Sequence, residues 1–374
     1  MQYRTLGSTG VQVSSLCLGS MMFGKWGNPD HDDSIALIRT ALDAGVNIID
    51  TADVYSGGES EVIVGKAVAG RRDEVVLATK VSSPMGPGLN ERGASRRWIV
   101  RACEESLRRL DTEYIDLYQV HRPDPTTDVD ETLGALSDLV RAGKIRYAGS
   151  STFSPSAIVQ AQWTAERRQR ERFVCEQPPY SLLARGVETD VLPTCEAYRM
   201  GVLAWSPLAG GWLSGRWRRD AADPSSHRTR TMPFRTTLSH YDLDVPGNQA
   251  KLDAATELAR IADEAGLTLI QLALAFVTTH PAVTAAVIGP RTAEHLHSQL
   301  SSADIVLEPT VLDHIDRVVA PGTDLNPDDT GYGAAVLTDP RRRRRTVTPR
   351  TPAVPVGRQG GDATESTTRA SRLG

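Results

Sequence analysis

The stretch "NIIDTADVYSGGESE", Asn47 to Glu61, contains a short apolar run that ends in a carboxylate. Ile48 and Ile49 are typical of a buried strand, and Asp50 follows them directly. Tyr55 comes five residues after Asp50, in a serine- and glycine-rich segment that predicts a turn. A buried strand that finishes on a charge raises the question of which charged groups end the neighbouring strands.

Short apolar runs alternate with amphipathic stretches along most of the chain. After a predicted N-terminal hairpin, eight strand candidates occupy residues 15–19, 47–50, 74–80, 114–121, 145–151, 172–177, 202–207 and 284–289. The intervening stretches open with Asp, Ser or Thr and close with Gly, as capped helices do. This alternation predicts an α/β fold, a (β/α)8 TIM barrel with an N-terminal β-hairpin. The competing doubly wound sheet normally carries GxGxxG after its first strand, and that motif is absent from the chain.

Composition indicates a soluble protein of the cytoplasm. Hydrophobic residues make up 40% of the chain and charged residues 24%, which allows a sizeable core. The start "MQYRTLGSTG" has no apolar signal region, and the stretch "LIQLALAFV" is too short to span a membrane. The four cysteines lie far apart with no CxxC pair, and we expect reduced thiols without a metal: Cys17, Cys103, Cys175 and Cys195.

The end of the chain differs from the rest in charge. From Arg341 to Gly374 there are nine arginines and two acidic residues, a balance of 9 − 2 = +7, so the remainder carries −4 − 7 = −11. We predict that residues 1–335 form the barrel domain and that residues 336–374 form a disordered tail. The arginine run could touch an acidic surface, although a solvated extension without function is the favoured alternative. The acidic body argues against a nucleic-acid partner.

One connection, residues 215–248, is too long for a linker inside a compact domain. Such a segment is a lid or binding loop, or else it is disordered. We expect a lid.

Two further strand candidates end in ionisable groups, Lys80 and His121. The carboxyl ends of barrel strands face one pocket, so these groups should meet Asp50 and Tyr55 there. An ammonium lowers the pKa of a nearby phenol, whose ordinary value is about 10, and a carboxylate keeps that ammonium charged. Tyr55 would then be a general acid, with His121 bonded to the same reacting oxygen. Such a set protonates a carbonyl oxygen, and a nicotinamide cofactor supplies the hydride that side chains lack.

Several ordered segments resemble the landmarks of the aldo-keto reductase family. They include "NIIDTADVYSGGESE", "DLYQVH", "EQPPYSLL", "VLAWSPLAGGWLSGR" and "AVIGPRTAEHLHSQL", and the likeness runs from about Tyr3 to Val319. The resemblance implies a barrel that binds NADP(H) without a Rossmann motif. It also implies a catalytic tetrad of Asp50, Tyr55, Lys80 and His121. Bacterial reductases and potassium-channel β-subunits are the branches that look most similar.

The resemblance further implies how the cofactor is held. Ser151 and Gln177 would bond the nicotinamide carboxamide, beside Thr152 at a position that is commonly Asn in the family. Trp205 would stack on the nicotinamide ring. The other implied cofactor-binding positions, besides Asp50, are Gly19, Ser20, Met21, Ser206, Leu208, Gly210, Gly289, Arg291 and Gln299.

A preference for NADPH over NADH is expected from the end of the last strand. Arg291 lies at the start of a predicted helix, where a guanidinium and free backbone amides favour the adenosine 2′-phosphate. His295 occupies a place that is Arg in related chains, and we otherwise expect His295 on the surface. Gln299 would meet the adenine.

Three functions stay open at this point. The first is an NADPH-dependent reductase of a small carbonyl compound: an aldehyde, a ketone or a keto-sugar. The second is a cofactor-binding partner subunit with little turnover. The third is a barrel that forms a Schiff base on Lys80, although this leaves Gln177 and Trp205 without a role.

Overall fold

The computed structural model describes residues 1–219, 240–331 and 340. The chain divides into two compact units, Met1–Gly333 and Ala334–Gly374, and the fold described here is that of the first. The predicted tail, apart from Pro340, lies outside the described residues, and so do residues 220–239 of the predicted lid.

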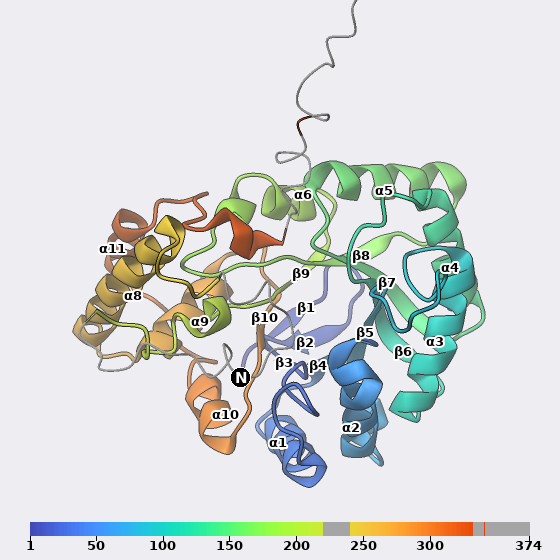
Figure 1. Ribbon diagram of the computed structural model, residues 1–374, viewed down its shortest axis with the longest axis horizontal. Coiled ribbons are helices and arrows are strands. Elements are labelled where there is room, and N and C mark those ends of the chain that lie inside the picture. Colours follow the sequence, from blue (N-terminus) through green and yellow to red (C-terminus); the bar gives the residue numbers. More distant parts are fainter. Residues whose placement is uncertain (220–239, 332–339, 341–374) are drawn as a thin grey trace, which may run out of the picture. The chain divides into compact units, whose positions relative to one another are not determined.

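Eight parallel strands close into a barrel in the order β10-β3-β4-β5-β6-β7-β8-β9, with the helices around it (Figure 1). The predicted (β/α)8 architecture is therefore confirmed. The barrel strands are β3 (Leu16–Gly19), β4 (Ile48–Asp50), β5 (Val76–Val81), β6 (Ile115–Val120), β7 (Ile145–Ser151), β8 (Phe173–Gln177), β9 (Gly201–Ala204) and β10 (Ala285–Ile288). The predicted N-terminal hairpin is also confirmed, with β1 (Tyr3–Thr5) antiparallel to β2 (Gln12–Ser14).

Polar side chains cap the first turn of several helices. Ser95 accepts a hydrogen bond from the Trp98 N–H, and Thr268 forms a capping box with Gln271. The α-helices are α1 (His31–Asp43), α2 (Glu59–Val68), α3 (Arg96–Leu110), α4 (Val129–Arg141), α5 (Pro155–Arg168), α6 (Val191–Ala197), α8 (Pro246–Glu264), α9 (Leu269–Thr279), α10 (Ala293–Leu300) and α11 (Pro309–Val318). Short 3-10 turns occur at η1 (Tyr55–Gly58), η2 (Arg72–Glu74), η3 (Gly186–Glu188), η4 (Ala209–Gly211) and η6 (Pro327–Thr330).

The barrel interior is built in two layers, because side chains alternate between the faces of each strand. The first layer is apolar and packs on the hairpin residues Leu6 and Val13; it consists of Cys17, Ile48, Ala78, Leu117, Cys175, Leu203 and Ala285. Two residues further along the same strands stand Gly19, Asp50, Lys80, Gln119, Gln177, Trp205 and Val287. The second layer therefore carries the polar groups at the carboxyl ends of the strands.

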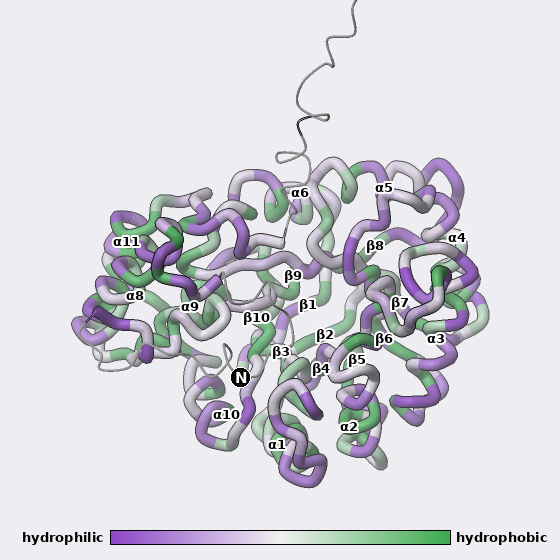
Figure 2. Tube along the Cα trace, in the orientation of Figure 1, coloured by the Kyte–Doolittle hydropathy of each residue, from purple (hydrophilic) through white to green (hydrophobic). Residues whose placement is uncertain are grey.

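The outward strand faces pack against the helices in one large apolar cluster. Leu18, Ile49 and Leu77 contribute from the strands, and Ile38 and Ile99 contribute from the helices. Figure 2 shows hydrophobic colour on the central strands around β3 and β10. The burial of this cluster from water is the main force that holds the helices on the barrel.

Two further expectations concern the cysteines and membrane-spanning helices. All four cysteines are buried and unbridged, as expected for reduced thiols. Over residues 1–219 and 240–331, no single helix is long and apolar enough to cross a bilayer; α8 and α9 pass that test only as a pair bent by 92°.

The turn of the N-terminal hairpin closes one end of the barrel against β9. Gly7 has a left-handed backbone (φ 55°), and a Cβ there would lie 2.7 Å from the Gly201 amide nitrogen. Gly10, in the same turn, also has positive φ (81°), but nothing lies within 4 Å of its Cβ position. Substitution of Gly10 therefore tests backbone strain alone, whereas substitution of Gly7 tests strain together with close packing.

We expect Gly7→Ala to lower the free energy of unfolding more than Gly10→Ala does, by about 1–3 kcal/mol. Both variants strain the backbone, but only Gly7→Ala forces the hairpin away from β9. Thermal and urea unfolding of both variants measures the difference. Equal losses of stability would show that the turn does not pack on the barrel in this way.

Candidate active site

Three ionisable side chains come from neighbouring strands at the carboxyl end of the barrel. Asp50 ends β4 and lies opposite Ala78 of β5, while Lys80 lies opposite Gln119 of β6. His121 follows β6 directly. The parallel register therefore brings the ends of β4, β5 and β6 to one place.

Tyr55 reaches the same place from the loop after β4. The turn that carries it is tight, with Ser56 in a left-handed backbone (φ 51°), and the Ser56 hydroxyl donates to the Phe23 carbonyl at 3.0 Å. This bond anchors the turn to the loop after β3. Strained residues of this kind are held by their surroundings and are frequent at functional sites.

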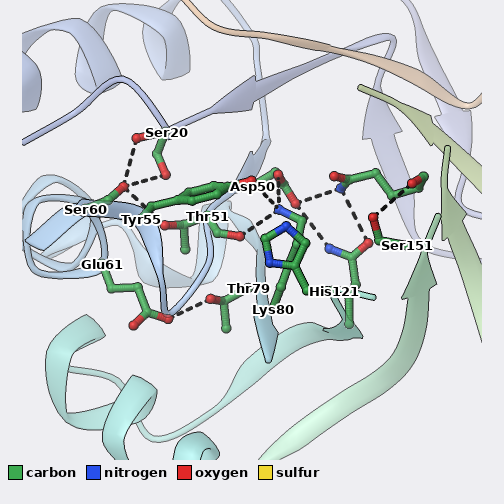
Figure 3. A network of polar contacts seen from close by, with 12 residues as sticks. Ser20, Asp50, Thr51, Tyr55, Ser60, Glu61, Thr79, Lys80, His121 and Ser151 are labelled. Atoms are coloured by element: carbon green, nitrogen blue, oxygen red, sulfur yellow. Dashed lines mark hydrogen bonds and ion pairs between the residues drawn. The ribbon is translucent and has the colours of Figure 1, made fainter. Parts of the chain in front are cut away.

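Lys80 links the two acidic groups of the predicted tetrad. Its Nζ donates to Asp50 Oδ2 at 2.5 Å, to the Thr51 carbonyl at 2.8 Å and to the Tyr55 hydroxyl at 3.3 Å (Figure 3). The ring of His121 meets the Tyr55 ring edge-on at 5.8 Å between centroids. The structure thus brings all four predicted residues together.

Two glutamines hold the second oxygen of Asp50. Gln119 Nε2 donates to Asp50 Oδ1 at 3.1 Å, and Gln177 Nε2 donates to the same atom at 2.8 Å. Gln119 was missed from the sequence, although it precedes His121 by two positions and therefore shares its strand face. With Lys80 on one carboxylate oxygen and two amides on the other, Asp50 is fixed in orientation.

Burial and charge oppose each other at the Lys80 and Tyr55 pair. Burial acts to lower the pKa of Lys80, but the Asp50 carboxylate and the Tyr55 hydroxyl raise it above its ordinary value. Burial also raises the pKa of Tyr55, and the Lys80 ammonium only partly opposes this. The expected lowering of the Tyr55 pKa below its ordinary value is therefore wrong for this structure, because desolvation of the phenol is the larger effect. Tyr55 is a protonated donor at neutral pH.

His121 is neutral at neutral pH. Burial, together with the charges of Lys80 and Arg122, lowers its pKa well below the ordinary value. A neutral imidazole beside a phenol can hydrogen-bond a substrate oxygen without competing for the proton. Ser83 Oγ lies 3.4 Å from His121 Nδ1.

A cavity of about 560 Å³ opens at this end of the barrel, and Asp50, Tyr55 and His121 line one part of it. Lys80 is fully buried behind Tyr55 and is not part of the lining. The other predicted cofactor residues that line the cavity are Gly19, Met21, Ser151, Gln177, Trp205, Ser206, Leu208, Gly210, Gly289, Arg291 and Gln299.

Ser20 differs from the expectation, since it is buried outside the cavity lining. Its backbone N–H donates to the Asp50 carbonyl at 2.9 Å, and its hydroxyl accepts from Ser60 at 2.8 Å. Ser20 therefore links the end of β3 to α2, and its neighbours Gly19 and Met21 line the cavity.

The predicted carboxamide residues are already linked to each other. Ser151 Oγ donates to the Gln177 carbonyl at 3.0 Å, and the side-chain amide of Gln177 is committed to Asp50. Trp205 lines the cavity, and its buried Nε1 has no hydrogen-bond partner within residues 1–219 and 240–331. The indole N–H can therefore donate to a ligand in the cavity, and the Arg122 guanidinium lies 5.7 Å from the centre of the ring.

The loop after β9, residues 206–217, forms a second part of the wall and is called the β9 loop below. Ser206 and Ala209 adopt left-handed backbones (φ 55° and 48°), as does Gly210 (φ 69°). Positive φ angles of this kind leave room for a close approach of a ligand to the backbone. Arg216 and Trp217 of this loop also line the cavity and were missed from the sequence.

Positive charge gathers at the end of the cavity near α10. Burial and the neighbouring Arg216 lower the pKa of Arg291. Burial, followed by the charges of both arginines, lowers the pKa of His295, and Glu294 partly offsets this. The two guanidiniums therefore repel each other, and a bound anion would relieve the repulsion. His295 is partly exposed and also lines the cavity.

Gln299 carries a buried acceptor in the same part of the cavity wall. Its Oε1 is buried, lies in the cavity wall, and has no hydrogen-bond partner in the described part of the chain. A buried acceptor of this kind costs about 1–3 kcal/mol unless it is paired. An anion near Arg291 and a donor near Gln299 fit a phosphorylated adenosine.

Glu176, next to Gln177 on β8, holds the loop after β7. Its carboxylate accepts from the Ser150 hydroxyl and from the Phe153 N–H at 3.0 Å. Burial raises the pKa of Glu176 to about 7, against these hydrogen bonds. The loop in turn keeps Thr152 in a left-handed backbone (φ 57°) beside Ser151 in the cavity wall.

A profile described as the aldo/keto reductase family matches residues 15–320 of the chain. An uncharacterized oxidoreductase of Bacillus subtilis (strain 168) is 40% identical over 323 residues, which cover 83% of this chain and 94% of that protein. A probable voltage-gated potassium channel subunit beta of Arabidopsis thaliana is 35% identical, over 85% and 97% of the two chains. Versiconal hemiacetal acetate reductase of Aspergillus parasiticus is 32% identical, over 86% and 98%.

We expect Glu176→Gln to change how stability depends on pH. A carboxyl whose pKa is raised on folding contributes stability below its unfolded pKa of about 4.5, and this is lost as pH rises through about 7. Between pH 5 and pH 8, the free energy of unfolding of the variant should therefore rise relative to that of the wild type, by up to about 3 kcal/mol. Urea unfolding at several pH values measures this, with the exposed Glu166→Gln as control. Parallel profiles for wild type and Glu176→Gln would contradict the assignment.

Proposed function

Since the chain belongs to the aldo/keto reductase family, we propose that it reduces the carbonyl group of an aldehyde, ketone or keto-sugar with NADPH. The observation that carries this proposal is the contact chain from Asp50 through Lys80 to the Tyr55 hydroxyl at the cavity wall. It supports proton donation to an oxygen bound beside Tyr55 and His121.

The cavity suits NADP(H) by three independent features. Trp205 offers a ring face, the β9 loop offers backbone groups, and the Arg216 and Arg291 pair offers positive charge. When bound, the reduced nicotinamide supplies the hydride that the carbonyl carbon accepts. Ser151, Gln177 and Trp205 would hold the nicotinamide end, and Arg291 and Gln299 the adenosine end.

The side chains of this chain divide the proton chemistry among themselves. Tyr55 donates its hydroxyl proton to the carbonyl oxygen as that oxygen gains negative charge. The Lys80 ammonium stabilises the phenolate that remains, and Asp50 keeps Lys80 charged and in place. Neutral His121 donates a hydrogen bond to the same oxygen and orients the substrate. A site that excludes water makes these electrostatic effects larger than they are in solution.

A binding role is the second candidate, since 35% identity to a potassium channel subunit beta extends over 85% of the chain. Measurement of turnover distinguishes the reductase from the binding role. Purified protein with NADPH and a panel of aldehydes, ketones, keto-sugars and pyridoxal should consume NADPH if the proposal is right. Tight NADPH binding without consumption on any substrate would favour the partner subunit.

We expect Tyr55→Phe to lower the reduction rate by about 10²–10⁴-fold, because a positioned general acid contributes about that factor. Its NADPH affinity should stay within a few-fold of the wild type. Tyr118→Phe is the matched control: Tyr118 lies in β6, and its buried hydroxyl has no partner over the described ranges. Steady-state rates with the best substrate compare the variants. A Tyr55→Phe enzyme as active as Tyr118→Phe would remove Tyr55 from the mechanism.

We expect Arg291→Leu to weaken NADPH binding about tenfold, since a charged hydrogen-bonded pair contributes roughly 1.4 kcal/mol or more. NADH lacks the 2′-phosphate, so its affinity should change less than about twofold. Titration calorimetry with both cofactors gives the two ratios. An equal loss for NADH and NADPH would mean that Arg291 does not read the 2′-phosphate.

A further inference from the structure

The segment that follows α11, residues 320–331, extends beyond the residues matched by the family profile, which end at residue 320. It is called the C-terminal segment below. The segment runs along the loop after β8: Arg185 N–H donates to the Thr323 carbonyl at 3.0 Å, and Leu325 N–H donates to the Leu183 carbonyl at 3.1 Å. It is therefore a fixed part of the fold at this end of the barrel.

Asp329 of this segment is the counter-ion of a buried lysine. Lys251 of α8 has no exposed side-chain surface, and its Nζ lies 2.6 Å from Asp329 Oδ2. Burial lowers the pKa of Lys251, and the Asp329 carboxylate opposes that effect. His240 Nδ1 lies 2.6 Å from the other carboxylate oxygen. Loss of Asp329 would leave the Lys251 ammonium buried without its partner, which is strongly unfavourable.

Lys251 also contacts the β9 loop. Its Nζ donates to the His240 carbonyl at 3.0 Å, and Trp212 Nε1 of the β9 loop donates to the same carbonyl at 3.3 Å. The ammonium lies 4.7 Å from the centre of a Trp212 ring, a cation–π contact. The ion pair and the β9 loop therefore share one packing unit.

This unit ends in the cavity wall. Tyr241 stacks on Trp212 at 6.0 Å with an interplanar angle of 11°, and its hydroxyl donates to the Gly210 carbonyl at 2.7 Å. Trp217 packs on Trp212 at 4.1 Å between centroids. Gly210 and Trp217 both line the cavity, so one layer of aromatic rings separates the Lys251–Asp329 pair from the cofactor space.

We propose that Lys251 and Asp329, with His240, form a clamp that positions the β9 loop for the cofactor, so that the C-terminal segment is part of the cofactor site. These are positioning residues, since none of them lines the cavity. The clamp holds the left-handed turn at Ser206–Gly211 in the shape that presents backbone groups to phosphate. The inference rests on the proposed NADPH function.

Three single variants, the double variant Asp329→Asn/Lys251→Met and one control test the clamp. Asp329→Asn and Lys251→Met each remove one charge, and Tyr241→Phe removes the hydroxyl that donates to the Gly210 carbonyl. The control, Glu257→Gln, removes an exposed pair with Arg260 on the same helix α8. NADPH dissociation constants come from tryptophan fluorescence, and turnover is measured at saturating NADPH, well below the unfolding temperature of each variant.

The clamp predicts that Asp329→Asn and Lys251→Met each weaken NADPH binding at least about tenfold, with turnover at saturation within about twofold of the wild type. The double variant should bind NADPH about as well as the single variant with the lower affinity, because both substitutions remove the same interaction. Tyr241→Phe should weaken NADPH binding about threefold, and Glu257→Gln should leave it unchanged.

Wild-type NADPH affinity in Asp329→Asn, Lys251→Met and Tyr241→Phe would overturn the clamp and leave the proposed function standing. If Asp329→Asn or Lys251→Met does not fold, the NADPH affinity of Tyr241→Phe alone tests the clamp. A wild-type protein that binds no NADPH would instead overturn the proposed function, and the clamp with it.

Discussion

The ion pair between Asp50 and Lys80 is the interaction on which the rest of the site depends. Both groups stand inside the barrel, Asp50 2% exposed and Lys80 not exposed at all, where an unpaired charge would be very costly. Pairing makes the two charges tolerable, and Gln119 and Gln177 bond the remaining Asp50 oxygen. Removing either partner typically costs 3–5 kcal/mol. The barrel thus holds an ammonium beside the Tyr55 hydroxyl at the carboxyl ends of its strands.

Strand alternation explains why this charge lies where it does. The same strands supply an apolar layer and, two residues later, a polar one on the same inward face, so a one-residue slip in a strand would turn both layers toward the helices. The hairpin residues Leu6 and Val13 cover the apolar layer and leave the polar layer facing the cavity. The same short strands therefore serve both stability and chemistry. Their apolar layer packs against the hairpin, and the polar layer at their carboxyl ends forms the site.

The sequence allowed the barrel, the hairpin and the meeting of Asp50, Tyr55, Lys80 and His121 to be predicted, because strand ends are local signals and parallel topology gathers them. It did not show Gln119, whose role depends on its neighbours in the sheet. Nor did it show Arg216 and Trp217, which reach the cavity only through the turn of the β9 loop. The direction of the Tyr55 pKa was predicted wrongly, since sequence reveals the nearby ammonium but not the degree of burial. Asp329 and Lys251 lie 78 residues apart, and only the fold pairs them.

The Lys80 ammonium lowers the proton affinity of the Tyr55 phenol, against the larger opposing effect of burial. The most direct measurement of this effect is the pKa of Tyr55 itself, by NMR of protein with ζ-carbon-labelled tyrosine, assigned through the loss of one signal in Tyr55→Phe. Lys80→Met keeps the site buried but removes the charge. We expect a higher Tyr55 pKa in Lys80→Met than in the wild type, because burial and the Asp50 charge then act without the ammonium that opposes them. An unchanged or lower pKa in Lys80→Met would contradict this role of Lys80.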